Sequence, residues 1–116
     1  MPQDVVEILC DLIRRPSVNP MGRDVDDDTS YEHRVTEYLQ QFFQRLDLPW
    51  QRQTVAPGRD NIVARLDGDV TGGESVPIVM FEAHQDTVPV ERMAIPPFEP
   101  SIREGRVYGR GACDIK

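Results

Sequence analysis

The chain has 116 residues, a length that fits one small domain with a modest hydrophobic core. Its 13 basic and 20 acidic side chains give a formal net charge of −7, which argues against a surface that binds nucleic acid. No apolar stretch approaches the roughly 18 residues of a membrane span. The start of the chain also lacks the basic and apolar regions of a secretory leader. With only Cys10 and Cys113 there is no disulfide framework, so we predict a cytoplasmic protein with reduced thiols and no membrane contact.

An amphipathic helix is predicted near the N-terminus, over residues 4–15. Its apolar side chains recur at steps of three and four residues, and they are Val5, Ile8, Leu9, Leu12 and Ile13. Asp4 can cap the start of this helix. Pro16 ends it, because a proline disfavours helical backbone in the residue before it.

An acidic loop follows the first helix. Asp24, Asp26 and Asp28 alternate in a way that suggests a calcium loop. A calcium loop of the EF-hand type would need a glycine and a glutamate where this chain has Thr29 and Val35. We therefore predict a solvated acidic loop rather than a calcium site.

A second amphipathic helix is predicted to open at Thr29 and to run to about residue 46. Thr29 and Glu32 have the spacing of a capping box, in which each side chain bonds a free backbone N–H group of the other residue. Apolar residues form one stripe along the helix, as expected for a helix that packs on a core. His33 lies among the polar positions and is predicted to be a surface residue.

Three strands are predicted in the middle of the chain. The first two, over residues 51–55 and 61–66, are joined by a turn at residues 57–60. The third covers residues 76–83 and is expected to be the central strand. Its continuous apolar run, at residues 78–81, is typical of a strand that is buried on both faces.

A proline-rich coil and a hairpin are predicted beyond that strand. Three prolines make residues 91–100 irregular, and Glu104 and Gly105 separate two short strands at residues 101–103 and 106–108. Helices that alternate with strands predict an α/β layered fold. Apolar central strands favour a mixed, largely parallel sheet.

The chemistry of the chain is concentrated where the predicted central strand ends. His84 and Asp86 are two residues apart, so an extended backbone would place their side chains on the same side. An imidazole beside a carboxylate suits a metal ligand that is held in one tautomer by a neighbouring acceptor. The alternative is a structural hydrogen bond at a strand end, and the spacing alone does not decide between the two.

A second polar stretch lies at the end of the chain, where small residues precede Asp114 in the run from Gly109 to Lys116. Glycine allows the close backbone approach and the unusual dihedral angles that a tightly held ligand position needs. The alternative is a glycine turn that carries an exposed aspartate.

Together the two stretches resemble the signatures of the M20 family of metallopeptidases and deacylases. The first is VMFEAHQDTVP at residues 79–89. The second combines Pro97 and Phe98 with GRVYGRGA at residues 105–112 and with Asp114, Ile115 and Lys116. The Arg-Pro-Ser-Val run at residues 15–18 and DNIVARL at residues 60–66 also fit, so the resemblance covers nearly the whole chain. It implies that residues 1–116 are the N-terminal part of an α/β/α catalytic domain.

The resemblance implies a role for each of three residues. His84 would bind one metal ion, Asp114 would bridge two metal ions, and Asp86 would accept the other imidazole N–H of His84 as part of the catalytic machinery. The ions would be Zn²⁺, with Co²⁺ or Mn²⁺ as alternatives. The implied reaction is hydrolysis of the amide bond in an N-acyl amino acid or small peptide, in a parent protein that could be a homodimer.

Three neighbouring residues could share in this chemistry. Glu82 lies on the same side of the strand as His84, but the family pattern gives it no role as a base. Cys113 could be a third ligand or a nucleophile, although alternation along an extended chain predicts that it packs beneath the site as a small hydrophobic residue. For Arg110, a structural ion pair is favoured over substrate contact.

Several parts of the family pattern are missing from the chain. Its general base, its remaining ligands and its second domain are not found here, so the chain alone is expected to bind metal weakly and to be inactive. A non-catalytic binding or regulatory module is the alternative function. Retention of His84, Asp86 and Asp114 together favours the enzyme.

Overall fold

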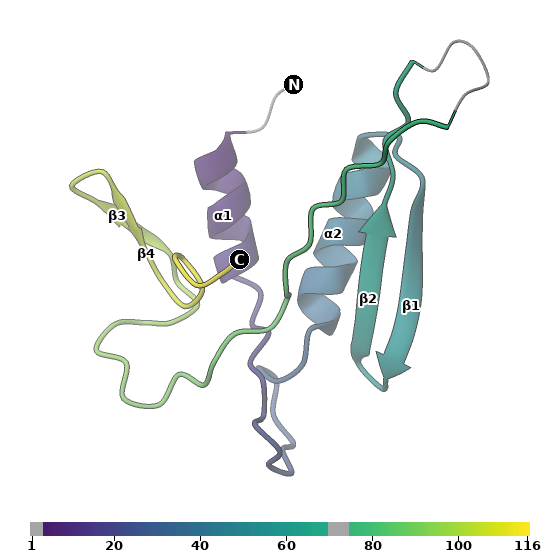
Figure 1. The fold of residues 1–116 in the computed structure, drawn as a ribbon. Coiled ribbons are helices and arrows are strands. Elements are labelled where there is room, and N and C mark those ends of the chain that lie inside the picture. The colour runs from purple at the N-terminus through teal and green to yellow at the C-terminus, as the bar shows by residue number, and fades with distance from the viewer. Residues whose placement is uncertain (1–3, 70–74) are drawn as a thin grey trace.

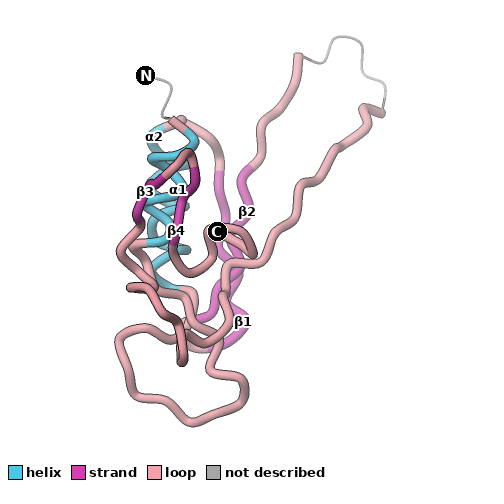
Figure 2. The backbone as a smooth tube through the Cα atoms, turned by 90° about the vertical axis from the view of Figure 1, so that its left-hand side faces the viewer, coloured by secondary structure: helices cyan, strands magenta, loops and turns pink. Residues whose placement is uncertain are grey.

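The computed structural model describes residues 4–69 and 75–116. Within these residues it contains two helices and two β-hairpins, joined by long irregular connections (Figures 1 and 2). None of these helices is long and apolar enough to cross a membrane. The elements in chain order are α1 (Val5–Ile13), α2 (His33–Arg45), β1 (Trp50–Ala56), β2 (Arg59–Ala64), β3 (Ser101–Arg103) and β4 (Arg106–Tyr108).

Helix α1 forms as its periodicity predicts. The Asp4 carboxylate accepts a hydrogen bond of 3.0 Å from the backbone N–H of Val6, which satisfies one of the free donors at the helix start. The helix ends at Ile13, whose side chain is completely buried. Prediction and structure thus agree on this element to within two residues at its end.

Helix α2 begins later than predicted, and the capping box does not form. The Thr29 hydroxyl bonds to the Asp27 carboxylate instead, and Glu32 makes no side-chain capping bond. The Glu32 carboxylate, almost fully buried, pairs with Arg59 of β2, with 2.6 Å between Oε1 and Nη2. Leaving a buried carboxylate without a charged partner costs more free energy than leaving a helix end without a cap. Glu32 therefore pairs with Arg59 of β2 and does not cap α2. His33 is exposed, as predicted.

The small core lies between the two helices. Leu12 of α1 packs with Val35 and Tyr38 of α2, and the partly buried Ile8 and Leu39 lie against them. Helix α2 also packs on the β1–β2 hairpin, so the order of these parts is α1, α2, hairpin (Figure 1).

The two strands predicted on either side of the turn at residues 57–60 form a hairpin, and the hairpin predicted at residues 101–108 is confirmed. Strands β1 and β2 are antiparallel with Trp50 opposite Ala64, and the turn contains Gly58 with a φ of 72°. A side chain is strained in that left-handed region, which is why glycine suits the turn. Strands β3 and β4 have the predicted bounds, with Ile102 opposite Val107.

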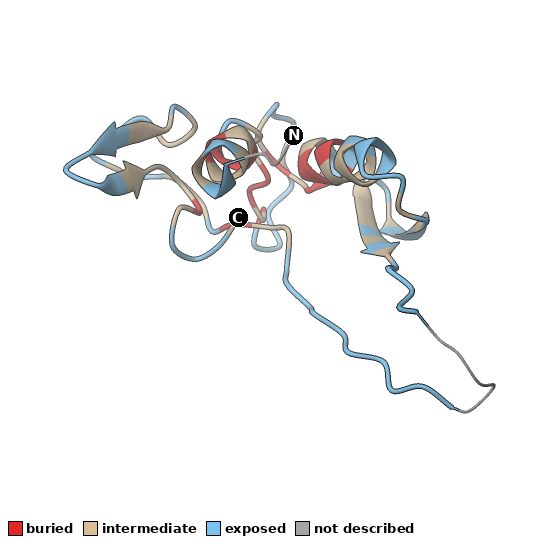
Figure 3. Cartoon of the chain, turned by 90° about the horizontal axis from the view of Figure 1, so that it is seen from above, coloured by how far each residue is buried: buried red, intermediate tan, exposed pale blue. Residues whose placement is uncertain are grey.

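The predicted central strand does not form. Residues 75–83, here called the arm, run as an unpaired segment away from the helices (Figure 3). Its apolar side chains are exposed rather than buried, with exposed fractions of 78% for Ile78, 77% for Val79, 74% for Met80 and 94% for Phe81. A strand needs a neighbour for its backbone hydrogen bonds, and no strand among the described residues pairs with the arm. The prediction of a strand buried on both faces is therefore wrong for this chain.

The predicted parallel sheet is likewise not shown. Helices and strands are mixed, as in an α/β protein, but both two-stranded sheets in the described part of the chain are antiparallel. Parallel pairing occurs only as isolated bridges in these ranges, where Val18 lies between Ser30 and Thr87. Here the backbone N–H of Asn19 donates to Thr87 O at 2.8 Å, and Thr87 N–H donates to Ser17 O at 2.9 Å. These bonds fix the base of the arm against the loop that follows α1.

Candidate metal centre

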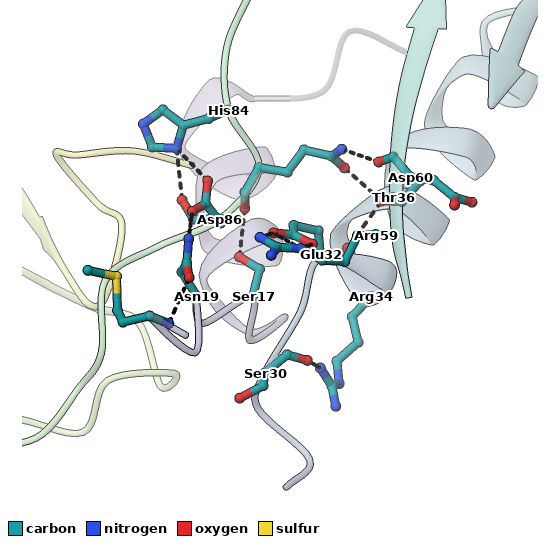
Figure 4. A network of polar contacts seen from close by, with 12 residues as sticks. Ser17, Asn19, Ser30, Glu32, Arg34, Thr36, Arg59, Asp60, His84 and Asp86 are labelled. Carbon is teal, nitrogen blue, oxygen red and sulfur yellow. Dashed lines mark hydrogen bonds and ion pairs between the residues drawn. The ribbon is translucent and has the colours of Figure 1, made fainter. Parts of the chain in front are cut away.

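His84 and Asp86 lie on the same side of the chain, as their spacing predicts. The Nδ1 atom of His84 is 2.8 Å from the backbone oxygen of Asp86 and 3.2 Å from its Oδ1 atom (Figure 4). Both neighbours of Nδ1 are oxygen acceptors, so the proton of a neutral imidazole belongs on Nδ1. The lone pair is then on Nε2, the nitrogen that is free to bind a metal ion.

Asp114 is brought to this free nitrogen from the other end of the chain. Its Oδ1 atom lies 3.8 Å from His84 Nε2. The Asp114 side chain is 92% exposed and that of His84 is 56% exposed, so solvent and ions can reach both. An imidazole lone pair and a carboxylate oxygen repel each other unless a cation or a proton lies between them. The three predicted site residues therefore converge on one place.

The side chain of Gln85, which lies between the two site residues in sequence, points the opposite way and attaches this segment to α2 and β2. The Thr36 hydroxyl of α2 donates a 2.8 Å hydrogen bond to Gln85 Oε1, and Gln85 Nε2 donates one of 2.8 Å to the Asp60 backbone oxygen of β2 (Figure 4). Thr36 is completely buried. Because Gln85 is held between a helix and a strand, His84 and Asp86 are held facing away from them.

Asp86 is kept charged by its surroundings. Partial burial raises its pKa, but the 2.8 Å hydrogen bond from Asn19 Nδ2, a bond from its own backbone N–H and the charge of Arg59 outweigh it, so the pKa stays below the usual range. Asn19 and Gln85 were not predicted as site residues. Their partners are distant in sequence, so no local pattern could have identified them.

The chain turns tightly around Asp114, and two predictions fail there. Cys113 is exposed rather than packed beneath the site, because residues 110–115 form turns in which the alternation of an extended strand does not apply. Arg110 makes no ion pair with any described residue, and its Nη2 atom donates to the Pro89 backbone oxygen at 3.2 Å instead. Glu82, on the arm, is exposed.

Lys116 lies at the end of the same turn with its ammonium group largely buried. Burial lowers the pKa of Lys116 to about 8, so the group still carries its proton at neutral pH and donates hydrogen bonds. Among the described residues, no group of three or more His, Cys, Asp or Glu side chains is arranged to hold a metal ion. The chain itself thus presents two facing ligands, His84 and Asp114.

Comparison with known proteins finds a family match for the segment that carries these residues. Residues 80–116, which include His84, Asp86 and Asp114, match the model of peptidase family M20/M25/M40. This segment of the chain is similar to the M20 family. This match confirms the resemblance for the part of the chain that holds both signature stretches. It does not extend to α1, α2 or the β1–β2 hairpin.

A relative outside this chain supports the same family. The chain is 53% identical, over 47 residues, to the succinyl-diaminopimelate desuccinylase of Methylococcus capsulatus. That alignment covers 38% of this chain and 12% of the desuccinylase, so the chain spans a small part of its relative's length. No solved structure matches the chain.

Proposed function

We propose that this chain is the N-terminal part of the catalytic domain of a metal-dependent hydrolase, with His84 and Asp114 as zinc ligands and Asp86 as the residue that orients His84. The observation that carries the proposal is the approach of His84 Nε2 to Asp114 Oδ1. At the other ring nitrogen, Nδ1, the backbone oxygen and the carboxylate of Asp86 are both placed to accept the proton. The match of residues 80–116 to the M20 family supports it.

His84 Nε2 and Asp114 Oδ1 are of the atom types that bind zinc, and the distance between them suits a zinc ion. Two ligand atoms, each about 2.1 Å from a tetrahedral zinc ion, lie about 3.4 Å apart. The separation of 3.8 Å between Nε2 and Oδ1 is close to this, and the exposed Asp114 side chain is free to turn. Co²⁺ and Mn²⁺ accept the same donors. When bound, such an ion polarises a carbonyl group and lowers the pKa of water.

The chain's own residues prepare that site. Asp86 holds the imidazole proton on Nδ1 and so keeps Nε2 available, while its negative charge makes the imidazole a stronger donor. The second oxygen of Asp114 is exposed and can serve a second ion, as expected for a bridging carboxylate in a site with two metals.

The remaining ligands and the general base are proposed to come from further sequence of the complete protein. Two protein ligands do not close a zinc site, which normally has three or four. In such a protein we also expect the apolar arm to become the central strand of a larger sheet. The alignment that covers only 12% of the desuccinylase is consistent with this division of the site.

The proposed substrate is an N-acyl amino acid or a small peptide, cleaved at its amide bond. Support comes from the family of the matched segment and from the desuccinylase relative. The complete protein is proposed to act on this small molecule in the cytoplasm, as a homodimer. Binding of nucleic acid or membrane is not part of the proposed function.

Zinc titration of the chain tests the centre. We expect weak binding that is lost in His84→Ala and in Asp114→Asn and retained in His33→Ala, which removes the other, exposed histidine. Cys113→Ser is expected to leave the affinity unchanged. If His84→Ala bound zinc as well as the unchanged chain does, the proposed centre would be wrong.

Turnover of N-acetyl and N-succinyl amino acids tests the division of ligands. The chain alone is expected to be inactive, and the longer protein that contains it active. Tight stoichiometric binding or turnover by the chain alone would contradict this division. A longer protein that binds zinc through His84 but hydrolyses none of these substrates would support the non-catalytic binding module instead.

A further inference from the structure

The position of Asp114 needs an explanation, because its side chain is exposed and its one ion-pair contact with a described residue is the 3.8 Å approach to His84. It lies on a turn that is held at both ends. At the first end, the backbone N–H of Arg110 donates to Pro97 O at 2.7 Å. At the other end, Lys116 reaches back to the loop after α1. The contacts of Lys116 therefore decide where the second half of the turn lies.

The Lys116 ammonium group has two partners on that loop. Its Nζ atom donates to the backbone oxygen of Arg15 at 2.7 Å and to Ser17 Oγ at 2.6 Å. The Arg15 carbonyl lies just beyond the end of α1, where carbonyl oxygens lack helical partners and attract cations. No described carboxylate forms an ion pair with Lys116. Its charge is directed to the loop rather than to the proposed metal ligands.

Ser17 also holds the segment that carries His84 and Asp86. This completely buried residue donates from Oγ to Gln85 O at 2.7 Å, and its backbone oxygen accepts a bond of 2.9 Å from Thr87 N–H. One hydroxyl group thus donates its single proton to one segment and accepts a hydrogen bond from the other (Figure 4 shows its bond toward the His84 segment).

Gly111 leaves room for this contact. A Cβ atom at this position would collide with Lys116 Cγ and would lie 3.1 Å from Thr87 Cγ2. Its φ of 84° is also one that other residues rarely adopt. The glycine lets the Lys116 stem pass close to the backbone on its way to Ser17.

We propose that Ser17 and Lys116 are positioning residues, whose hydrogen bond sets the distance between His84 and Asp114. This inference rests on the proposed function, since it gives a purpose to that distance. Ser17 fixes the His84 segment through Gln85 and Thr87, and Lys116 brings the Asp114 turn to the same serine. Neither residue is a metal ligand.

The test compares Lys116→Met, which keeps an apolar stem and removes the hydrogen bonds, with Lys116→Arg, which keeps a cation. Arg106→Met is the matched control, because it removes one positive charge from an exposed position on β4. The first readout needs no metal: nuclear Overhauser contacts between the His84 ring and the 113–115 turn. We expect Lys116→Met to lose them, Lys116→Arg to retain part of them, and Arg106→Met to keep them all.

The second readout is zinc affinity, where Lys116→Met is expected to weaken binding by about tenfold or more. Thermal unfolding, followed in parallel, is expected to show that the helices of Lys116→Met remain folded. Ser17→Ala should reproduce the lost contacts, and Lys116→Met is the decisive variant if Ser17→Ala fails to fold. Unchanged contacts in Lys116→Met would overturn the positioning role. If His84→Ala does not alter zinc binding, the proposed function fails. The contacts between the His84 ring and the 113–115 turn are measured without metal, so they still test the hydrogen bond between Lys116 and Ser17.

Discussion

The β3–β4 hairpin and the arm both have the sequence pattern of strands, yet only the hairpin forms them. The hairpin strands, Ser101–Arg103 and Arg106–Tyr108, pair with each other across a two-residue turn. The arm has the more apolar sequence but no partner among the described residues, and it remains unpaired and exposed. An apolar pattern therefore produces a strand only where a partner strand is at hand, since backbone donors and acceptors need to be satisfied.

The largest expected difference is in the loss of unfolding free energy when isoleucine is replaced by alanine in the packed part of the chain and in the arm. Ile13→Ala removes a completely buried side chain and should cost about 2–5 kcal/mol of unfolding free energy. Ile78→Ala changes a side chain that is 78% exposed and should cost less than about 0.5 kcal/mol. Urea denaturation measures both, and equal losses would mean that the arm is packed in solution.

The anchor at the base of the arm is expected to have the next largest effect. Thr36→Val removes the buried hydroxyl that donates to Gln85 and should cost about 1–3 kcal/mol, because Gln85 Oε1 loses its donor. Amide hydrogen exchange at Thr87 should become faster as the segment loosens. Thr54→Val, at an exposed position of β1, is the control and should change neither quantity. Unchanged exchange at Thr87 in Thr36→Val would show that Gln85 does not anchor the segment.

The contact between the β3–β4 hairpin and α1 can be tested at Gly109. A Cβ atom there would lie 2.6 Å from Ile13 Cγ2, so Gly109→Ala should cost about 1–3 kcal/mol through overpacking. Gly68→Ala is the control, because nothing lies within 4 Å of the added atom. A Gly109→Ala chain as stable as the Gly68→Ala chain would mean that the hairpin does not rest on α1.

The smallest effect is expected at the tip of the exposed run. Phe81→Ala should alter the unfolding free energy of this chain by less than about 0.5 kcal/mol, since the ring is 94% exposed. In a longer protein that buries the arm, the same change should cost about 3–5 kcal/mol. Chemical denaturation of both proteins compares the two values. A negligible loss in the longer protein would contradict the proposal that the arm becomes a central strand.

The site divides in a similar way into what was predictable and what was not. The spacing of His84 and Asp86 predicts that their side chains lie on the same side of the chain. The glycines before Asp114 indicate that this residue could be a ligand. The sequence does not predict the hydrogen bonds that Asn19 donates to Asp86, that Thr36 donates to Gln85 and that Gln85 donates to the Asp60 backbone oxygen. Each joins residues that are far apart in the chain, and a single sequence contains no record of such contacts.

By itself, the sequence determined the elements whose partners are near neighbours. Helix α1, both hairpins and the pairing of His84 with Asp86 depend on turns, caps and periodicities within a few residues. Only the tertiary structure decided that Glu32 pairs with Arg59 instead of capping α2 and that the arm stays unpaired. The approach of Asp114 to His84 was implied by the family resemblance, and the structure supplies its distance. The physical reason is that burial and long-range hydrogen bonds outweigh local preferences, and both depend on where distant residues lie.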